Sequence, residues 1–198
     1  MGPMEPNSLG GHRYMCCLTC DNTSYVWVFF LKLKDQTLLN IKAFVLMTEK
    51  QTSLKIKFFH LDRGSEFMLD KYTKFLQEQG ITCEMSAPYT PQQNGVAEYM
   101  NQTLLGGAQS MMEHAGMTKG FWAKAIGVAA HVLNHFPHKG LDWRMLYELL
   151  YSRVLEVSYL RVFRIAEIWY GCLEKFSCGV RVAQKTSNDK TSSNGSCA

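Results

Sequence analysis

The first third of the chain alternates short apolar blocks with polar breaks in a way that fits β-strands. Residues 13–20 and 25–32 are rich in β-branched, aromatic and small apolar side chains, and the polar residues 21–24 separate them. Two such blocks joined by a short polar turn predict a β-hairpin. Residues 35–50 carry apolar side chains near a period of 3.6, which predicts an amphipathic helix.

The next segment alternates strand and helix patterns. A strand is expected over 54–61, a short helix over 70–79 that closes at Gly80, and another strand over 81–86. Because antiparallel strands come first and strand–helix alternation follows, the order predicts an α/β fold in which helices flank a mixed sheet.

The second half of the chain is patterned mainly for helices. A Pro- and Gln-rich segment, residues 87–95, leads into a predicted helix of about five turns at 1.5 Å per residue. Thr118 is placed to cap a further helix that stops before Pro137, and residues 142–151 fit one more short helix. The apolar face of the long helix would consist of Ala97, Met100, Leu104, Ala108 and Met111.

Composition places the chain among globular proteins and excludes several classes. Hydrophobic residues make up 46% and aromatic residues 12% of the 198 residues, which is unlike a disordered chain. The apolar runs are too short to span a bilayer, and the first residues lack the basic and apolar regions of a secretory signal, so an intracellular protein with no membrane partner is expected. A net charge of +4 favours polyanionic partners but is too small to establish one.

Seven cysteines without a secretory signal are expected to be reduced thiols. Cys17 and Cys20 form a C-x-x-C pair, and His131, His135 and His138 could complete a zinc site. The alternative is that small cysteines simply suit the buried face of the first strand. The sequence leaves both interpretations open, with the buried strand favoured.

Two carboxylates have the placement of metal ligands. Asp62 ends a predicted strand, and Glu98 lies near the start of the long helix, with 35 residues between them. Acidic side chains from a strand end and a helix can converge as oxygen ligands for Mg²⁺, which assists phosphoryl transfer. Alternatively, Asp62 caps a turn and Glu98 complements the helix dipole.

A resemblance to a known family rests on long stretches of the sequence. These are GPM and SLGGHRYMCCLTCDNTSYVWVFFLK within 2–32, HLDRGSEF at 60–67, QEQGITCEMSAPYTPQQNGVAEYMNQTLL at 77–105, and HAGMTKGFWAKAIGVAAHVLNHFP at 114–137. They strongly resemble the integrase catalytic core of copia-type LTR retrotransposon Pol polyproteins. The likeness covers roughly residues 2–163, so we expect a core-like domain over 1–163 and a divergent, largely disordered tail over 164–198.

The resemblance implies a ribonuclease-H-like fold and a D,D,E triad that binds Mg²⁺ or Mn²⁺. It implies 3′ processing and strand transfer on DNA, multimers of the protein on paired DNA ends, and nuclear localisation if the protein is functional. On this likeness, Asp62 and Glu98 are the second and third triad acids, both catalytic and metal-binding. The segment before Glu98 would be a mobile active-site loop in which Asn94 caps the helix. The residues expected to contact DNA are Gln92, Gln93, Asn94, Arg63 and Lys119.

The family places the first triad acid just upstream of the Gly-Pro-Met motif, which here is Gly2-Pro3-Met4. We therefore expect the triad to be incomplete within this sequence and the first, central strand to be shortened. Asp21 is a candidate substitute, although a one-residue change of register would turn it to the other face, and capping of the hairpin turn is the simpler role.

Three functional hypotheses remain. The chain could be an integrase core whose activity is lost with the first acid, a module that binds nucleic acid or a partner without catalysis, or a decayed product that folds poorly. Whether it is an enzyme stays open at the level of sequence.

Overall fold

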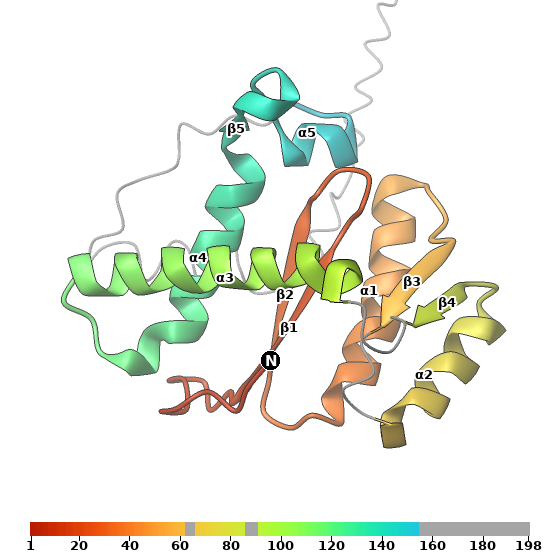
Figure 1. Cartoon of the computed structure of the whole chain (residues 1–198), viewed down its shortest axis with the longest axis horizontal. Coiled ribbons are helices and arrows are strands. Elements are labelled where there is room, and N and C mark those ends of the chain that lie inside the picture. The colour runs from red at the N-terminus through yellow and green to blue at the C-terminus, as the bar shows by residue number, and fades with distance from the viewer. Residues whose placement is uncertain (62–65, 86–90, 155–198) are drawn as a thin grey trace, which may run out of the picture.

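The computed structural model of the protein describes residues 1–61, 66–85 and 91–154 (Figure 1). The expected boundary between residues 163 and 164 and the expected tail lie outside the described residues. None of the described helices is long and apolar enough to cross a lipid bilayer.

The predicted hairpin is present. Strands β1 (Tyr14–Thr19) and β2 (Val26–Leu31) pair antiparallel, from Tyr14 opposite Leu31 to Thr19 opposite Val26. Successive side chains of a strand point to opposite faces, so this hairpin presents apolar groups on both sides. Helix α1 (Gln36–Thr52) follows and ends at Ser53, which adopts a left-handed conformation with φ of 58°.

A strand–helix–strand unit comes next. Strands β3 (Phe58–Leu61) and β4 (Thr82–Met85) pair in parallel, with Phe58 opposite Thr82. Helix α2 (Glu66–Glu78) connects them, and Gly80 ends the connection with φ of +70°. Glycine suits this position because it has no Cβ to clash in the left-handed region.

The remaining elements are mainly helical, as the sequence predicted. Helix α3 is the long helix that crosses the front of the molecule in Figure 1. A small antiparallel hairpin of β5 and β6 separates α4 from α5, with Pro137 opposite Met145. The bounds are α3 (Pro91–His114), the 3₁₀ helix η1 (Lys119–Phe121), α4 (Trp122–His135), β5 (Pro137–His138), the 3₁₀ helix η2 (Lys139–Leu141), β6 (Arg144–Met145) and α5 (Leu146–Tyr151).

Two apolar cores hold the described elements together. Core 1 lies between the hairpin and α3 and α4, and includes Met15, Leu104 and Ile126, each no more than 1% exposed. Core 2 lies between α1, α2 and the β3–β4 pair, and is built by Ile41, Phe44, Val45, Phe59, Tyr72, Leu76 and Ile81. The hairpin contributes to both: Cys17 and Phe30 pack on core 1, while Leu18 and Phe29 pack on core 2.

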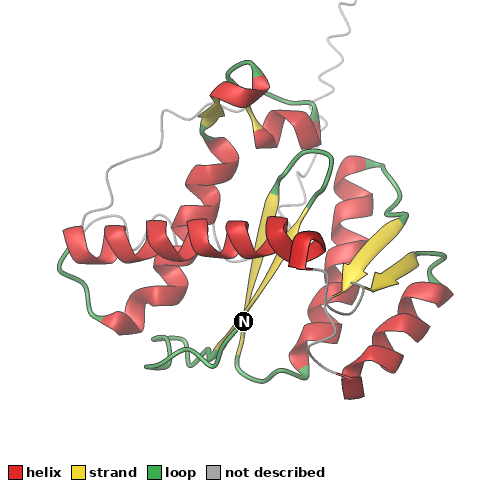
Figure 2. Ribbon diagram, viewed as in Figure 1, coloured by secondary structure: helices red, strands yellow, loops and turns green. Residues whose placement is uncertain are grey.

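The α/β class is confirmed, with helices on both sides of the strands. The strands described here do not form one mixed sheet, however. They form separate two-stranded sheets, β1–β2, β3–β4 and β5–β6 (Figure 2). Within the described residues, no backbone pairing joins β1 to β3.

Candidate functional site

Strand β3 leads directly to the first predicted carboxylate. Phe59 is buried in core 2, which fixes the strand, and β3 ends at Leu61 immediately before Asp62. Asp62 and Arg63 themselves lie outside the described residues, so the distance between the Asp62 and Glu98 carboxylates is a prediction that the structure does not test.

Glu98 lies in α3, but the local structure around it differs from the expectation. The helix begins at Pro91, so residues 91–95 form its first turns, and Asn94 lies inside the helix instead of capping it. Proline favours this start because its fixed φ suits the first helical position, where its missing N–H would lack a helical partner anyway. The expected loop over residues 91–95 was therefore wrong, and Glu98 lies about two turns inside the helix.

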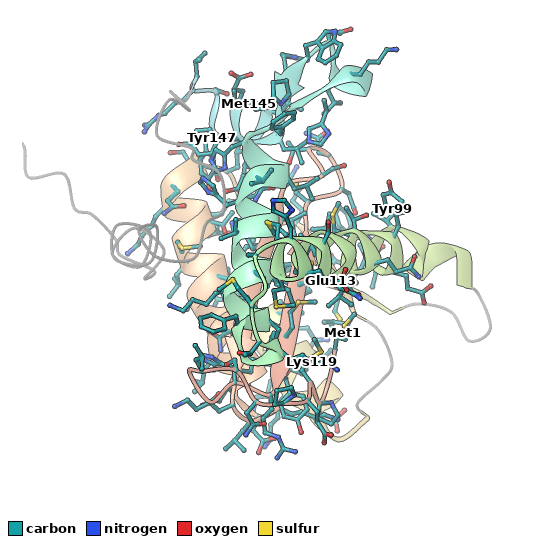
Figure 3. The ribbon with its side chains drawn as sticks, turned by 90° about the vertical axis from the view of Figure 1, so that its left-hand side faces the viewer. Met1, Tyr99, Glu113, Lys119, Met145 and Tyr147 are labelled. Carbon is teal, nitrogen blue, oxygen red and sulfur yellow. The ribbon has the colours of Figure 1, made fainter. Side chains whose placement is uncertain are left out.

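The Glu98 side chain is exposed, and it forms no ion pair with any residue that the structure describes. Among the described residues, no cation therefore competes for its carboxylate oxygens. A hard oxygen donor of this kind fits Mg²⁺ or Mn²⁺. The neighbouring Tyr99, 67% exposed, projects away from the other elements in Figure 3.

The predicted DNA-contacting residues fall in different parts of the molecule. Gln92 and Gln93 lie in the first turn of α3, whereas Lys119 is exposed in η1, beyond the opposite end of that helix. Glu98 and His114, where α3 ends, are separated by roughly 24 Å of helix at 1.5 Å per residue. Lys119 and Glu98 are thus not brought together, and Figures 1 and 3 show η1 away from the N-terminal half of α3.

A charged cluster beside β3 was not found by sequence reasoning. The His60 Nε2 atom lies 3.5 Å from Asp21 Oδ2, and its Nδ1 atom lies 3.3 Å from Glu84 Oε2. His60 and Glu84 are opposite each other in the parallel register, so the β3–β4 pairing would have revealed their contact had it been known. Asp21, predicted either to cap the hairpin turn or to replace a triad acid, instead faces an imidazole from the other sheet.

The alternative zinc site is not formed by the described side chains. No group of three or more His, Cys, Asp or Glu residues suited to a metal ion occurs among residues 1–61, 66–85 and 91–154. His135 Nδ1 lies 2.8 Å from the His131 carbonyl, and His138 Nε2 lies 2.9 Å from the Leu133 carbonyl. Burial raises the pKa of the Cys17 thiol to about 11, as expected for a small apolar side chain on a covered strand face.

Two tryptophans lie in different environments. Trp122 is 4% exposed and its indole N–H donates to the Pro6 carbonyl, as expected for a packing residue. Trp143 is 67% exposed and has φ of 61°, so it is not part of either core. It stands between Asp142 and Arg144, both exposed, where the chain turns from η2 into β6.

Comparison with known proteins relates this chain to one family. The family model described as integrase core domain matches residues 3–91, a range that includes Asp62 and ends before Glu98. The chain is 33% identical over 162 residues to the retrovirus-related Pol polyprotein from transposon TNT 1-94 of Nicotiana tabacum, covering 82% of this chain and 12% of the relative. It is 26% identical over 159 residues to the corresponding polyprotein from transposon RE2 of Arabidopsis thaliana, covering 80% and 11%.

Two solved structures share the fold. The simian T-cell lymphotropic virus intasome in complex with the PP2A regulatory subunit B56 gamma has a chain that matches with a TM-score of 0.59 and 14% identity, over 72% of this chain and 49% of that chain. The catalytic core domain of BIV integrase matches with a TM-score of 0.50 and 20% identity, over 70% and 85%. These likenesses establish a ribonuclease-H-like fold alone, and the chain spans about a tenth of the length of the Pol polyproteins it matches.

Proposed function

We propose that this chain, which is related to the integrase core domain of retrotransposon Pol polyproteins, binds DNA and contributes Asp62 and Glu98 to a metal-dependent phosphoryl-transfer site. The observation that carries the proposal is the relationship itself, over 162 residues at 33% identity. The placement of β3 supports it, because that strand is fixed by core 2 and ends immediately before Asp62.

Asp62 and Glu98 are the residues that would hold the metal. When bound, a divalent ion activates the attacking oxygen and stabilises charge on the leaving oxygen. The role of Glu98 requires an unpaired carboxylate on a rigid element, and its exposed position on α3 meets that requirement. Gln92, Gln93 and Asn94 lie up to two turns before it and would contact the DNA backbone without fixing its sequence.

The 198-residue polypeptide by itself is proposed to bind DNA without processing or joining it. The resemblance places the first acid ahead of Gly2, and Asp21, the candidate substitute, contacts His60 at 3.5 Å. Two carboxylates would hold a metal more weakly than three and would not bridge a pair of ions. The alternative is a binding module in which neither acid has a role.

Binding to DNA would come mainly from cations that contact phosphates. Lys119 is exposed in η1, and Lys139 and Arg144 are exposed around the β5–β6 hairpin. Such contacts make affinity fall with salt, by a slope of about −0.9 per phosphate contact on a logarithmic scale. Assembly into multimers on DNA ends and action in the nucleus are parts of the same proposal.

The test measures DNA affinity and strand cleavage of the 198-residue polypeptide by fluorescence anisotropy and by gel, with Mn²⁺ or with chelator. We expect salt-sensitive binding, with affinity that Mn²⁺ raises in the unchanged protein and not in Asp62→Ala or Glu98→Ala, and no nicking. Lys119→Ala is expected to reduce the salt slope by about one. Lys42→Ala is the matched control, because the Lys42 ammonium lies over the Phe75 ring, 5.0 Å from its centroid.

Each outcome separates the hypotheses. Nicking that needs Mn²⁺ and disappears in Asp62→Ala would show that the polypeptide is an active enzyme. Binding that ignores both substitutions and chelator would favour the non-catalytic module. Absence of any cooperative thermal unfolding would favour the decayed product.

A further inference from the structure

The chain before β1 forms a fixed turn beside η1. The Ser8 N–H donates to the His12 carbonyl at 3.0 Å, and the His12 N–H donates to the Ser8 hydroxyl at 2.9 Å. The Leu9 N–H donates to the Gly120 carbonyl at 3.0 Å, which joins the turn to η1. Figure 1 shows the two segments side by side at the lower left, so Lys119, the first residue of η1, lies next to the turn.

The end of β2 lies against the same turn. A Cβ atom added at Gly11 would lie 3.8 Å from the Lys32 Cε atom and 4.0 Å from its Nζ atom. The Arg13 N–H donates to the Leu31 carbonyl at 2.9 Å, so Arg13 stands beside the end of β2. Burial and the nearby charge of Lys32 lower the pKa of His12, which shows that this charge reaches the turn.

Four exposed cations from these segments form a surface that we call the basic end. They are Arg13, Lys32, Lys34 and Lys119. The ion pairs of the described residues are formed by Lys55 and His60, so none of the four has an acidic partner among residues 1–61, 66–85 and 91–154. The Lys34 ammonium lies over the Tyr14 ring, 5.6 Å from its centroid, a contact that keeps the positive charge.

The basic end lies on the side of the molecule toward which β3 runs. Strand β2 leads into α1, which returns the chain over 17 residues toward the start of β3. Strands β2 and β3 therefore run in the same direction, and Figure 1 shows β3 pointing toward the end at which β2 stops. Ligands of open α/β folds gather outside the carboxyl ends of the strands, so the basic end has the position of a ligand surface.

The side chains of the basic end suit phosphates better than bases. Residues 5–14, 32–36 and 116–121 present no exposed aromatic ring, since Tyr14 and Phe121 are half-buried. Bases of a single strand need such rings to stack on. Separate cations instead attract a duplex, which carries one negative charge per about 1.7 Å of its axis.

We propose that the basic end binds the sugar–phosphate backbone of a DNA duplex, without reading its sequence and without a metal ion. The duplex lies across η1 and the open end of the hairpin, on the side where β3 ends. The inference rests on the proposed DNA binding and names the surface that carries it. Lys119 then acts together with Arg13, Lys32 and Lys34, in a surface separate from the first turn of α3.

The first test maps the contact without any substitution. Lysines of the 198-residue polypeptide are acetylated in chelator, with and without a duplex of about two helical turns, and mass spectrometry measures each site. We expect the duplex to protect Lys32, Lys34 and Lys119. Lys50 is the internal control, because it is exposed and lies about 21 Å along α1 from Gln36, so its acetylation should not change.

The second test removes charge from two lysines and keeps the length of their side chains. In the variant that combines Lys32→Gln with Lys34→Gln, the salt slope of duplex binding should fall by about two, one for each lost phosphate contact. Lys50→Gln is the control and should leave the slope unchanged. Melting midpoints of both variants show whether the fold is retained. A single strand of the same length should bind the unchanged polypeptide more weakly than the duplex, because its charge density is lower.

The outcomes separate this inference from the proposed function. If the unchanged polypeptide binds the duplex and the double variant keeps the slope of Lys50→Gln, the basic end is not the surface, while the proposed DNA binding stands. If the unchanged polypeptide does not bind the duplex, both are wrong. Vesicles containing phosphatidylserine test an anionic membrane as the competing partner, for which the exposed Leu9 and Leu33 would be anchors; tighter binding to vesicles than to the duplex would overturn the inference.

Discussion

Substitution of Asn134 tests how much the hydrogen bonds between α4 and β2 contribute to stability. Its side chain is 4% exposed and lies at the end of α4. The Val26 N–H donates to Asn134 Oδ1 at 2.9 Å, and Asn134 Nδ2 donates to the Val26 carbonyl at 2.7 Å. The amide thus takes the place of a neighbouring strand at the outer edge of β2.

Asn134→Ala removes both hydrogen bonds and leaves the Val26 N–H and C=O buried without partners. A net hydrogen bond contributes about 1 kcal/mol, and an unsatisfied buried group costs about 1–3 kcal/mol. We therefore expect a loss of about 2–4 kcal/mol in the free energy of unfolding, or about 5–15 °C in the melting midpoint for a chain of this size. Thermal and urea unfolding followed by circular dichroism would measure it.

Asn101→Ala is the matched control within α3. The Asn101 Oδ1 atom is buried but accepts no hydrogen bond from any residue in the described ranges. Its removal should therefore change the free energy of unfolding by less than about 1 kcal/mol. If both alanine variants lose the same stability, the two hydrogen bonds to Val26 do not hold the hairpin and the reasoning is wrong.

Four further substitutions give measurable outcomes. Burial lowers the pKa of His131 to about 4, and His135 adds to this shift, so between these pH values the unfolded chain binds a proton that the folded chain does not. The free energy of unfolding should therefore be fully retained above about pH 6.5 and fall by about 1–2 kcal/mol toward pH 4, after allowance for partial exposure. In urea unfolding at a series of pH values, His131→Gln should flatten this dependence. Gly106→Ala should raise the free energy of unfolding by about 0.5–1 kcal/mol, because an added Cβ would meet no atom within 4 Å, whereas Gly80→Ala should lower it by about 1 kcal/mol because its φ is +70°. Trp143→Ala should weaken binding of single-stranded DNA at least about five-fold, the loss of one stacked base, with an unchanged melting midpoint; equal affinity would exclude a stacking role.

The order of elements was predictable because each has a strong local pattern. The hairpin agrees with its expected bounds to within one residue at each end, since its alternating apolar residues face cores on both sides. Strand β3 is shorter than expected because the segment before it, residues 54–57, contacts α1 instead of extending the strand. There, the Lys55 ammonium and the Ile56 N–H both contact the Glu49 carboxylate at the end of α1.

The family was predictable from the sequence, whereas the candidate site stays a prediction because Asp62 lies outside the described residues. The motif context of Asp62 and Glu98 led to the family that the comparisons support. The start of α3 was misjudged because Asn94 and Gly95 suggest a cap, while Pro91 is an equally good helix start. The His60 cluster depends on a parallel pairing between distant segments, which local pattern does not encode.

The double-faced hairpin has a consequence for how the molecule melts. Trp122 reports on core 1, and Trp27 packs on core 2 against Phe44, with ring centroids 4.9 Å apart. Because the side chains of β1 and β2 alternate between core 1 and core 2, the hairpin cannot separate from one core without disturbing the other. Single Trp→Phe replacements would distinguish the fluorescence changes of Trp27 and Trp122 on unfolding. Both changes should occur in one transition, because core 1 and core 2 unfold as a single cooperative unit.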